Sequence, residues 1–441
     1  MLTRLGAVLQ PAVLLCAAMV AIFLVAGLTR PRGVTVVDEV DYFTEAKALA
    51  AGADLRDQRS YLPRNGGVPW VGPRYPLGWP LLLAPFVLAG SGSAHSPAPG
   101  GISPAGAARW SLGRAPFLAN LMLHLLGAAV LAHVLRRRGV PRRWALLYLA
   151  QPTLLLFSGT LMAEPAAALH TALLLAIACE ERPLLLGFVA GLAPFLKLSQ
   201  VIVCAPLVLV RCLRAPGRAR ALSLAALGAA LPLAAFIALD LWLYGTPLGP
   251  VRPGYAGPLA ALRWGALELG QLAVAWPLLP LAILVARREE SVAAAACVVY
   301  FAFYDSARYS GASAAATLVV GARLLAPAIV LLLPGYATLL ARMPRRATFA
   351  VLLAVSIVAP IAIFPALARR RRELVAVRTA TLAHLRPECS YLYEQNEVRK
   401  LLIPWPSNAR LLSVIDPRPA SGCILPLEYG TVTTNVLPVV R

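Results

Sequence analysis

Long apolar segments follow one another along most of this chain, separated by short charged stretches and by proline and glycine. The first apolar segment covers residues 5–28, and similar segments continue to residue 367, where a more polar tail begins. An α-helix needs about 20 consecutive apolar residues to cross a bilayer. The pattern therefore predicts an all-α polytopic membrane protein with a bundle of about eleven transmembrane helices.

The predicted spans divide into unbroken and interrupted segments. Residues 144–179 are long enough for two spans, and we expect Glu164-Pro165 to separate them because proline removes a helix hydrogen bond. Residues 183–210 are predicted as two short helices that meet on the outer side at Lys197. The segments predicted as single spans are 5–28, 112–135, 221–239, 264–286, 291–304, 323–340 and 348–367.

Two parts of the chain are predicted to lie outside the bilayer. The first outer loop, residues 29–110, carries a helix that begins near Asp38, is capped by it, and rests on the membrane surface. In the same loop, residues 78–90 are apolar but too short to span, which indicates an interfacial or re-entrant element. We expect residues 1–368 to form the transmembrane module and residues 369–441 a small extracytoplasmic domain with short β-like runs.

Composition supports the membrane assignment and excludes a nucleic-acid partner. The chain is 59% hydrophobic and 14% charged, with a mean hydropathy of +0.71, whereas soluble domains carry about 25% charged residues. The net charge is +21, but the arginines cluster between apolar segments, as in residues 136–138. This distribution is typical of cytoplasmic loops rather than of a basic binding stripe. The arginines at 369–372 disagree with this topology, because they would lie outside.

The cysteines are distributed unevenly between the two predicted sides. Of seven cysteines, only Cys389 and Cys423 fall in a segment predicted to be outside. Two cysteines in an oxidising compartment pair readily, so we expect a disulfide between them. The alternative is two free thiols in a cytoplasmic tail.

Candidate chemistry gathers on the predicted outer side. The first outer loop alone contributes six carboxylates, which are Asp38, Glu39, Asp41, Glu45, Asp54 and Asp57. Lys197 stands inside an apolar segment, where an ammonium costs about 2.5–3.5 kcal/mol, so it is a functional candidate unless it snorkels to the interface. Arg323, with Arg308 and Tyr309, is predicted to form an anion site, because guanidinium binds phosphate through a planar fork of donors. The histidines show no metal-ligand spacing.

Several short motifs occur in the order found in one known family. An Asp38-Glu39 pair with Tyr42 follows the first span, and Arg74-Tyr75-Pro76-Leu77-Gly78 comes later in the same loop. The further motifs, in chain order, are Glu164-Pro165, Leu196-Lys197-Leu198, Tyr244-Gly245-Thr246-Pro247-Leu248, Gly254-Tyr255 and Arg323-Leu324-Leu325-Ala326-Pro327. In this order and topology the chain resembles the GT-C glycosyltransferases, and is similar to their protein O-mannosyltransferase and aminoarabinose-transferase group. Position 77 departs from the pattern, because Leu stands where a second proline is common.

The resemblance implies an inverting transfer of a sugar from a polyprenyl-phosphate donor to an acceptor hydroxyl on the outer face. It gives Asp38 the role of catalytic base with Glu39 as its neighbour, and Lys197, Arg323 and Arg308 the donor phosphate. The residues expected to line the substrate pocket are Asp41, Tyr42, Arg74, Tyr75, Glu164, Tyr255 and Tyr309. Some relatives use a metal here, but this chain has Asp-Glu-Val-Asp in place of Asp-x-Asp, so a divalent metal stays an open alternative and no other cofactor is expected.

Two other functions fit an integral membrane protein of this size, whose partners include membrane lipids. A transporter or flippase for a lipid-linked glycan would use broken helices, but such proteins often carry internal repeats, and we find no clear repeat here. A non-catalytic assembly subunit is the third alternative. The cluster of carboxylates in one outer loop favours the enzyme, whose acceptor is a glycan, a lipid or a protein.

Overall fold

The computed structural model describes the helical part of the chain and separate pieces of the tail. It covers residues 37–57, 59–60, 70–71, 73, 75–90, 115–247, 258–275, 278–305, 323–344, 346–347, 376–377, 379–380, 383, 386, 389–393, 410–413, 423–428 and 431–432. The predicted spans at 5–28 and 348–367 therefore lie outside the described residues.

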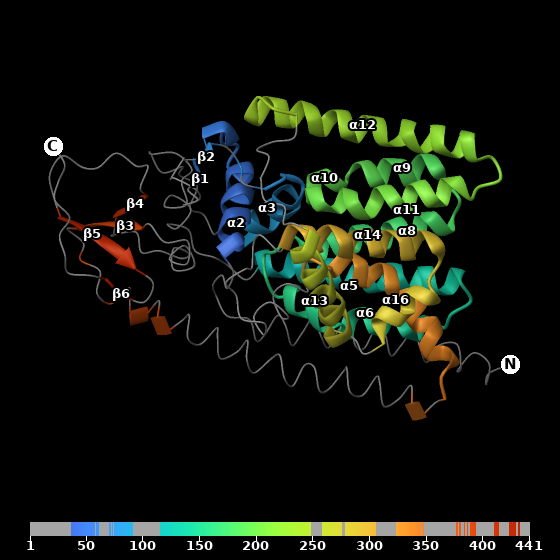
Figure 1. Cartoon of the computed structure of the whole chain (residues 1–441). Helices are drawn as coiled ribbons and strands as arrows, with labels where there is room; N and C mark the ends of the chain where they lie inside the picture. Colours follow the sequence, from blue (N-terminus) through green and yellow to red (C-terminus); the bar gives the residue numbers. More distant parts are fainter. Residues whose placement is uncertain are drawn as a thin grey trace, which may run out of the picture.

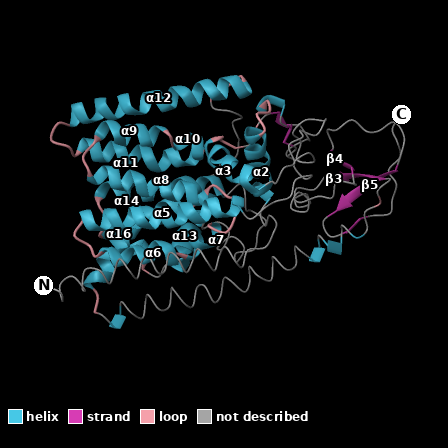
Figure 2. Ribbon diagram, turned by 180° about the vertical axis from the view of Figure 1, so that it is seen from behind, coloured by secondary structure: helices cyan, strands magenta, loops and turns pink. Residues whose placement is uncertain are grey.

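Five helices run side by side at the centre of a bundle (Figures 1 and 2). They are α5 (Ala115–Arg137), α8 (Glu164–Cys179), α11 (Val201–Leu213), α14 (Arg288–Asp305) and α16 (Ala326–Arg342). Helix α8 packs against α5 and α16, and α14 packs against α11 and α16. Fully buried side chains such as Leu175 and Leu331 fill the space between them. This all-helical architecture agrees with the periodicity of the sequence.

Two of the described helices are long and apolar enough to cross a membrane, α5 and the outer helix α12 (Arg218–Tyr244). The side of α12 that faces away from the bundle is exposed, with Leu227 65% and Leu231 70% exposed. Exposed leucines are expected on a helix that faces lipid. Five further apolar helices are shorter, with 10–17 residues. The structure therefore does not establish the predicted count of eleven spans.

Helix α12 lies directly on α9 (Pro183–Gly191), and glycines make this contact close. A Cβ atom added to Gly187 would overlap the carbonyl oxygen of Ala225, and one added to Gly228 would overlap that of Leu184. Gly187 and Gly191 are four residues apart on one face of α9. Small residues at this spacing let helix backbones approach closely in membranes.

The predicted interruption at Lys197 is confirmed. Helix α10 (Ala193–Leu196) ends there, Lys197 is extended with φ −167° and ψ 125°, and the short 3-10 helix η3 (Leu198–Gln200) leads into α11. The predicted division of residues 144–179 at Glu164-Pro165 is also found, because these residues begin α8 and residues 158–163 before them are not helical. Pro165 occupies the first helical turn, where its missing N–H has no intrahelical partner to lose.

Two predicted spans, one before α8 and one at residues 264–286, differ from the helices in the structure. Before α8 the chain forms only short helices, η2 (Arg142–Ala145), α6 (Leu146–Ala150) and α7 (Pro152–Phe157). The predicted span 264–286 is divided into α13 (Pro258–Ala275) and η4 (Leu279–Leu284). At the start of η4, Leu278 adopts a left-handed φ of 70°.

The first loop contributes α2 (Val37–Ala50) and α3 (Gly78–Gly90), which pack against each other at one end of the bundle. Between them lie η1 (Leu55–Asp57) and the antiparallel pair β1 (Arg59–Ser60) and β2 (Trp70–Val71). Helix α2 begins before Asp38, which therefore lies in its first turn rather than at its cap. Its apolar residues do not rest on a membrane surface as predicted, because Val40, Phe43 and Ala46 are buried in a core shared with α3 and the tail.

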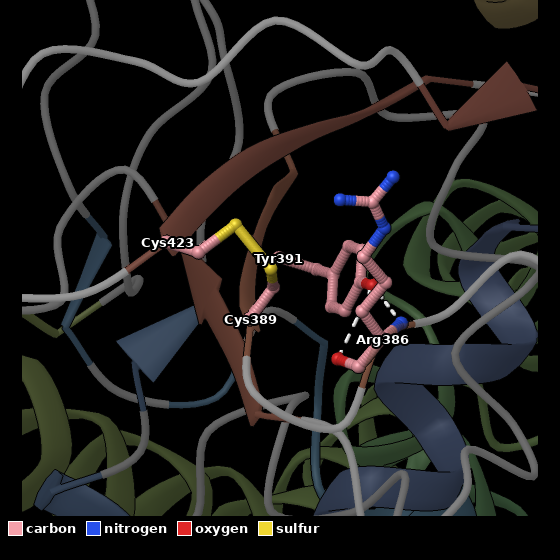
Figure 3. The surroundings of a disulfide bond; sticks show 4 residues. All are labelled: Arg386, Cys389, Tyr391 and Cys423. Atoms are coloured by element: carbon pink, nitrogen blue, oxygen red, sulfur yellow. Dashed lines mark hydrogen bonds between the residues drawn. A yellow bond between two sulfur atoms is a disulfide. The ribbon is translucent and has the colours of Figure 1, made fainter.

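The described part of the tail forms a small sheet in the order β4-β3-β5-β6. Strand β3 (Cys389–Tyr393) is parallel to β4 (Arg410–Ser413) and β5 (Cys423–Glu428), and β6 (Thr431–Val432) pairs antiparallel with β5. Cys389 and Cys423 lie opposite each other in the β3–β5 register and form a disulfide (Figure 3). The neighbouring Tyr391 hydroxyl bonds to the backbone of Arg386 and is buried against the α2 core.

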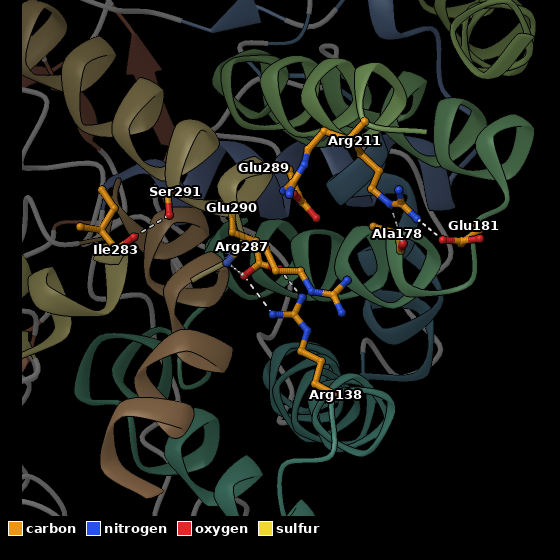
Figure 4. Close-up of polar contacts among 10 residues, drawn as sticks. Arg138, Ala178, Glu181, Arg211, Ile283, Arg287, Glu289, Glu290 and Ser291 are labelled. Carbon is orange, nitrogen blue, oxygen red and sulfur yellow. Dashed lines mark hydrogen bonds and ion pairs between the residues drawn. The ribbon is translucent and has the colours of Figure 1, made fainter. Parts of the chain in front are cut away.

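The two ends of the bundle differ in chemistry. At the end that holds α2 and α3, helices α5, α8, α11 and α16 begin and helix α12 ends. At the opposite end, arginines pair with glutamates, as in Arg138–Glu290 at 2.9 Å and Arg211–Glu181 at 2.9 Å (Figure 4). All of these residues come from segments predicted to be cytoplasmic, so the predicted sides correspond to the two ends of the fold.

Candidate functional site

Four charged side chains from four separate segments meet at the α2 end of the bundle. Arg323 donates to the Asp38 carboxylate over 3.3 Å. Lys197 donates to Glu164 Oε1 over 3.2 Å. Arg323 Nε lies 4.0 Å from the same Glu164 oxygen, so Glu164 joins the two ion pairs. We call Asp38, Glu164, Lys197 and Arg323 the charge cluster.

The charge cluster is largely shielded from solvent. Side-chain exposure is 4% for Glu164, 8% for Arg323, 15% for Asp38 and 24% for Lys197. Two cations and two carboxylates balance one another, which is what burial of charges requires. Breaking such a set by removing one member leaves an uncompensated charge. The cluster is therefore a costly feature of the fold and a candidate for function.

Local backbone structure presents each member of the charge cluster. Glu164 occupies the first turn of α8, where the helix dipole favours a carboxylate. Lys197 projects from the extended residue between α10 and η3, and Arg323 from the turn before α16. At the start of α3, Gly78 lies so close to the Phe195 backbone that a Cβ atom would come within 2.6 Å of its carbonyl oxygen. This contact holds α3 beside the interruption that carries Lys197.

Two tyrosines stand next to the charge cluster. The rings of Tyr42 and Tyr75 stack with centroids 4.5 Å apart. Burial raises the pKa of Tyr42 well above its usual value, with further contributions from Tyr75 and the carboxylates of Glu164, Asp38 and Glu45. The Tyr42 phenol therefore stays protonated. Glu45, in turn, accepts a bond from the backbone N–H of Tyr75 over 3.2 Å.

Glu39 has a different environment from Asp38. It is 1% exposed, and its carboxylate accepts a hydrogen bond from the backbone N–H of Leu161 over 2.8 Å. Trp79 donates to the carbonyl of the same residue over 2.7 Å. Asn120 donates to the carbonyls of Thr160 and Met162, both over 2.7 Å. Together these bonds fix the segment between α7 and α8 against α2, α3 and α5, so Glu39 positions backbone while Asp38 contacts Arg323.

The remaining predicted site residues are buried on α2 or lie outside the described residues. Asp41 is buried on α2 with 2% exposure. Arg74, Tyr255, Arg308 and Tyr309 lie outside the described residues. Sequence reasoning missed Trp79 and Asn120, whose hydrogen bonds hold the site in place. No motif marks them, although polar groups at apolar helix positions do signal buried hydrogen bonds.

The described residues contain no group of three or more His, Cys, Asp or Glu side chains arranged for a metal ion. What the charge cluster offers instead is a pair of cationic donors beside a carboxylate. Ammonium and guanidinium groups bind phosphate oxygens through charge-assisted hydrogen bonds. A carboxylate a few ångströms away is suited to accept a proton from a hydroxyl.

Comparison with known proteins relates the fold to solved structures. No family model and no curated protein matches the sequence. Two crystal structures of ArnT from Cupriavidus metallidurans match the fold. The apo form has a TM-score of 0.54 and 18% identity, with 86% of this chain and 66% of that chain covered. The form bound to undecaprenyl phosphate has a TM-score of 0.57 and 16% identity, with 92% and 86% covered. This chain thus spans just under two thirds of one ArnT chain and most of the other, and its fold is similar to that of ArnT, an aminoarabinose transferase of the GT-C class.

Proposed function

We propose that this protein is an inverting glycosyltransferase of the membrane that moves a sugar from a polyprenyl-phosphate donor to an acceptor hydroxyl. The observation that carries the proposal is the charge cluster, in which Arg323 contacts the Asp38 carboxylate and Glu164 joins Arg323 to Lys197. The fold similarity to ArnT supports it, because one of the two ArnT structures holds undecaprenyl phosphate. The apolar composition and the exposed leucines of α12 support the membrane location.

In the proposed reaction, Lys197 and Arg323 bind the phosphate of the donor. The acceptor oxygen forms a bond to the anomeric carbon while the bond between that carbon and the phosphate oxygen breaks. The bonding electrons leave with the phosphate, which departs as polyprenyl phosphate. The hydroxyl proton passes to Asp38. Attack from the face opposite the leaving group inverts the anomeric configuration.

The contact between Arg323 and Asp38 implies an exchange of partners when the donor binds. The Asp38 oxygen that accepts from Arg323 at 3.3 Å is the group that must face the acceptor hydroxyl. The donor phosphate, a phosphodiester with one negative charge, offers the guanidinium a fork of two acceptor oxygens. Arg323 therefore turns toward the phosphate, and Asp38 is released to act as base. Donor binding and activation of the base are coupled in this way.

Glu164 is assigned to the substrate pocket in this scheme. Its Oε1 holds Lys197, while its Oε2 is buried and has no hydrogen-bond partner among the described residues. A buried carboxylate oxygen without a partner is costly, and a ligand hydroxyl or amine would satisfy it. Tyr42, kept protonated by its surroundings, supplies a donor nearby. We assign Asp41, Arg74, Tyr75, Tyr255 and Tyr309 to the same pocket and Arg308 to the phosphate, as the resemblance implies.

We also propose an orientation for the chain. The end with α2 and the charge cluster faces the outside, and residues 369–441 form an extracytoplasmic domain on the same side as the reaction. The disulfide between Cys389 and Cys423 supports this placement, since such bonds persist in oxidising compartments. Nucleotide sugars are cytosolic, so a donor used outside must cross the membrane on a lipid.

The experiment is a transfer assay with purified protein in detergent and a synthetic polyprenyl-phosphate sugar. We expect Asp38→Asn to reduce transfer by about 10²–10⁴-fold, because an amide cannot accept the proton, while donor binding is retained. Glu39→Gln is the matched control and should keep most activity, since its oxygen can still accept from Leu161. Full activity in Asp38→Asn would remove Asp38 as the base. Full activity in both variants would favour a transporter or an assembly subunit.

A further inference from the structure

A second candidate binding site lies at the end of the bundle opposite the charge cluster. A cavity of about 380 Å³ opens between the end of α8, the start of α9 and the turn from α11 to α12. Arg182, Arg211 and Arg220 line it, together with a single carboxylate, Glu181. We name this space the arginine cavity. It adjoins a more polar cavity of about 320 Å³ that shares Glu181 and Arg211.

The lining of the arginine cavity is amphipathic. Apolar side chains such as Ile177, Leu186 and Leu224 form one part of its wall, and the arginines form another. The apolar part continues along α12, where Leu227 is 65% and Leu231 is 70% exposed. A ligand that fits this surface has an anionic group at the helix ends and an apolar chain that follows α12. A free anion would use only the arginines.

The arginines of the cavity are only partly neutralised within the described part of the chain. Arg211 pairs with Glu181 over 2.9 Å (Figure 4), and Arg182 lies 3.6 Å from Glu180. Among the described residues no carboxylate lies within ion-pair distance of Arg220. Three arginines thus line the cavity with one glutamate, and the site carries a surplus of positive charge.

The start of α12 adds to this surplus. Its cap residue is Gly217, which provides no side-chain hydrogen bond, and its first turn contains no acidic residue. Arg218 and Arg220 stand there instead, next to the positive end of the helix dipole. Cations are unfavourable at that end, whereas anions are stabilised by the free backbone N–H groups and the dipole. An anion in the cavity would offset both effects.

We propose that the arginine cavity binds an anionic phospholipid, with the headgroup phosphate held by Arg182, Arg211 and Arg220 and an acyl chain lying along α12. Basic pockets between helices on the cytoplasmic side of membrane proteins bind anionic headgroups in this manner. The site is distinct from the charge cluster, because it lies at the other end of α8 and α12. Its occupant is a constant component of the bilayer rather than a substrate of the transfer reaction.

The test is native mass spectrometry of the full chain in detergent, titrated with phosphatidylglycerol. We expect bound phosphatidylglycerol adducts on the wild type, and about tenfold or weaker binding in the double variant Arg182→Ala/Arg220→Ala, since each basic residue adds to the attraction of anionic lipid. Neither residue belongs to the charge cluster, and neither side chain is buried, so the fold should persist.

The matched control is Arg142→Ala/Arg143→Ala, which removes the same charge from exposed positions at the same end of the bundle, outside the cavity. It should bind phosphatidylglycerol like the wild type. Phosphatidylcholine should bind poorly, and inorganic phosphate should compete only weakly. Equal losses in the two double variants would overturn the proposal in favour of general surface charge. Full competition by inorganic phosphate would overturn it in favour of a free-anion site.

Discussion

Arg323 holds the position on which the site depends, since it contacts Asp38 at 3.3 Å and lies 4.0 Å from Glu164. An arginine that bridges two carboxylates in the absence of ligand has an arrangement that a phosphate can replace. Its exposure is only 8%, so the exchange happens in a shielded environment where charge-assisted hydrogen bonds are strong. Lys197 has the same kind of arrangement with Glu164 alone.

Glu39 and Asp38 are neighbours in sequence, yet the structure predicts different consequences for their removal. We expect Glu39→Ala to lower the free energy of unfolding by about 1–3 kcal/mol, because the buried N–H of Leu161 loses its acceptor. Asp38→Asn keeps its size and can still accept from Arg323. Thermal unfolding in detergent, followed by tryptophan fluorescence, measures the stability of both variants. A melting temperature in Glu39→Ala equal to the wild type would contradict the positioning role.

The sequence predicted Asp38, Lys197 and Arg323 as candidates, but not how they are paired. Asp38 and Arg323 are 285 positions apart, and nothing local in either segment specifies the partner. The neighbour Glu39 shows the same limit, since its hydrogen bond to Leu161 spans 122 positions. Long-range pairing depends on how the helices pack, which the apolar pattern does not encode in detail.

Among the helices, the close contact between α9 and α12 gives a sharp prediction. We expect Gly187→Ala to destabilise the fold by about 1–3 kcal/mol, because the new methyl group would overlap the carbonyl of Ala225 and force the helices apart. Gly270→Ala is the control, since a Cβ at Gly270 on α13 meets nothing within 4 Å. Alanine there should be neutral or stabilising by up to about 1 kcal/mol.

Thermal melting of the purified variants in detergent compares the two substitutions directly. A lower melting temperature for Gly187→Ala but not for Gly270→Ala is the expected result. If both variants melt like the wild type, the two helices are less closely packed than the structure indicates. If both are equally destabilised, the effect belongs to alanine itself rather than to the helix contact.

At the level of helices and strands, the sequence was most informative where polarity interrupts an apolar segment. Lys197 marked a real break, because an ammonium and an irregular backbone occur together at the end of a membrane helix. Glu164-Pro165 marked the start of α8, since proline is favoured in the first turn of a helix. The burial of α2 was missed, because its packing partners include Tyr391, far away in the tail. Strand β3 was not predicted either, because it forms by pairing with β4 and β5, which lie farther along the chain.

For the whole molecule, the two chemically distinct ends predict a sidedness that can be measured. We expect an engineered cysteine in Ser60→Cys, beside η1 at the charge-cluster end, to react with a membrane-impermeant maleimide added to intact cells. A cysteine in Arg143→Cys, exposed at the other end, should react only after permeabilisation. The wild type provides the background from native thiols. The reverse pattern would place the site inside and would remove the reason for a lipid-linked donor.

The two ends of the bundle could be predicted from the sequence because arginine clusters recur at one end of successive apolar segments. The structure brings those clusters to one end, with Arg138, Arg211 and Arg214 each paired to a glutamate. The tail could be predicted only in part. Its two cysteines indicated a bridge, which closes a separation of 34 residues and contributes roughly 3–4 kcal/mol by loop entropy. Its strand order depends on long-range pairing and could not be predicted.

The central claim is that Lys197 and Arg323 bind a lipid phosphate beside the Asp38 base. The most direct measurement is an experimental structure of the full chain bound to polyprenyl phosphate. The account predicts phosphate oxygens within about 3.2 Å of Lys197 Nζ and of the Arg323 guanidinium, with the Arg323–Asp38 contact opened. A phosphate bound elsewhere, with Arg323 still on Asp38 and Lys197 still on Glu164, would contradict it.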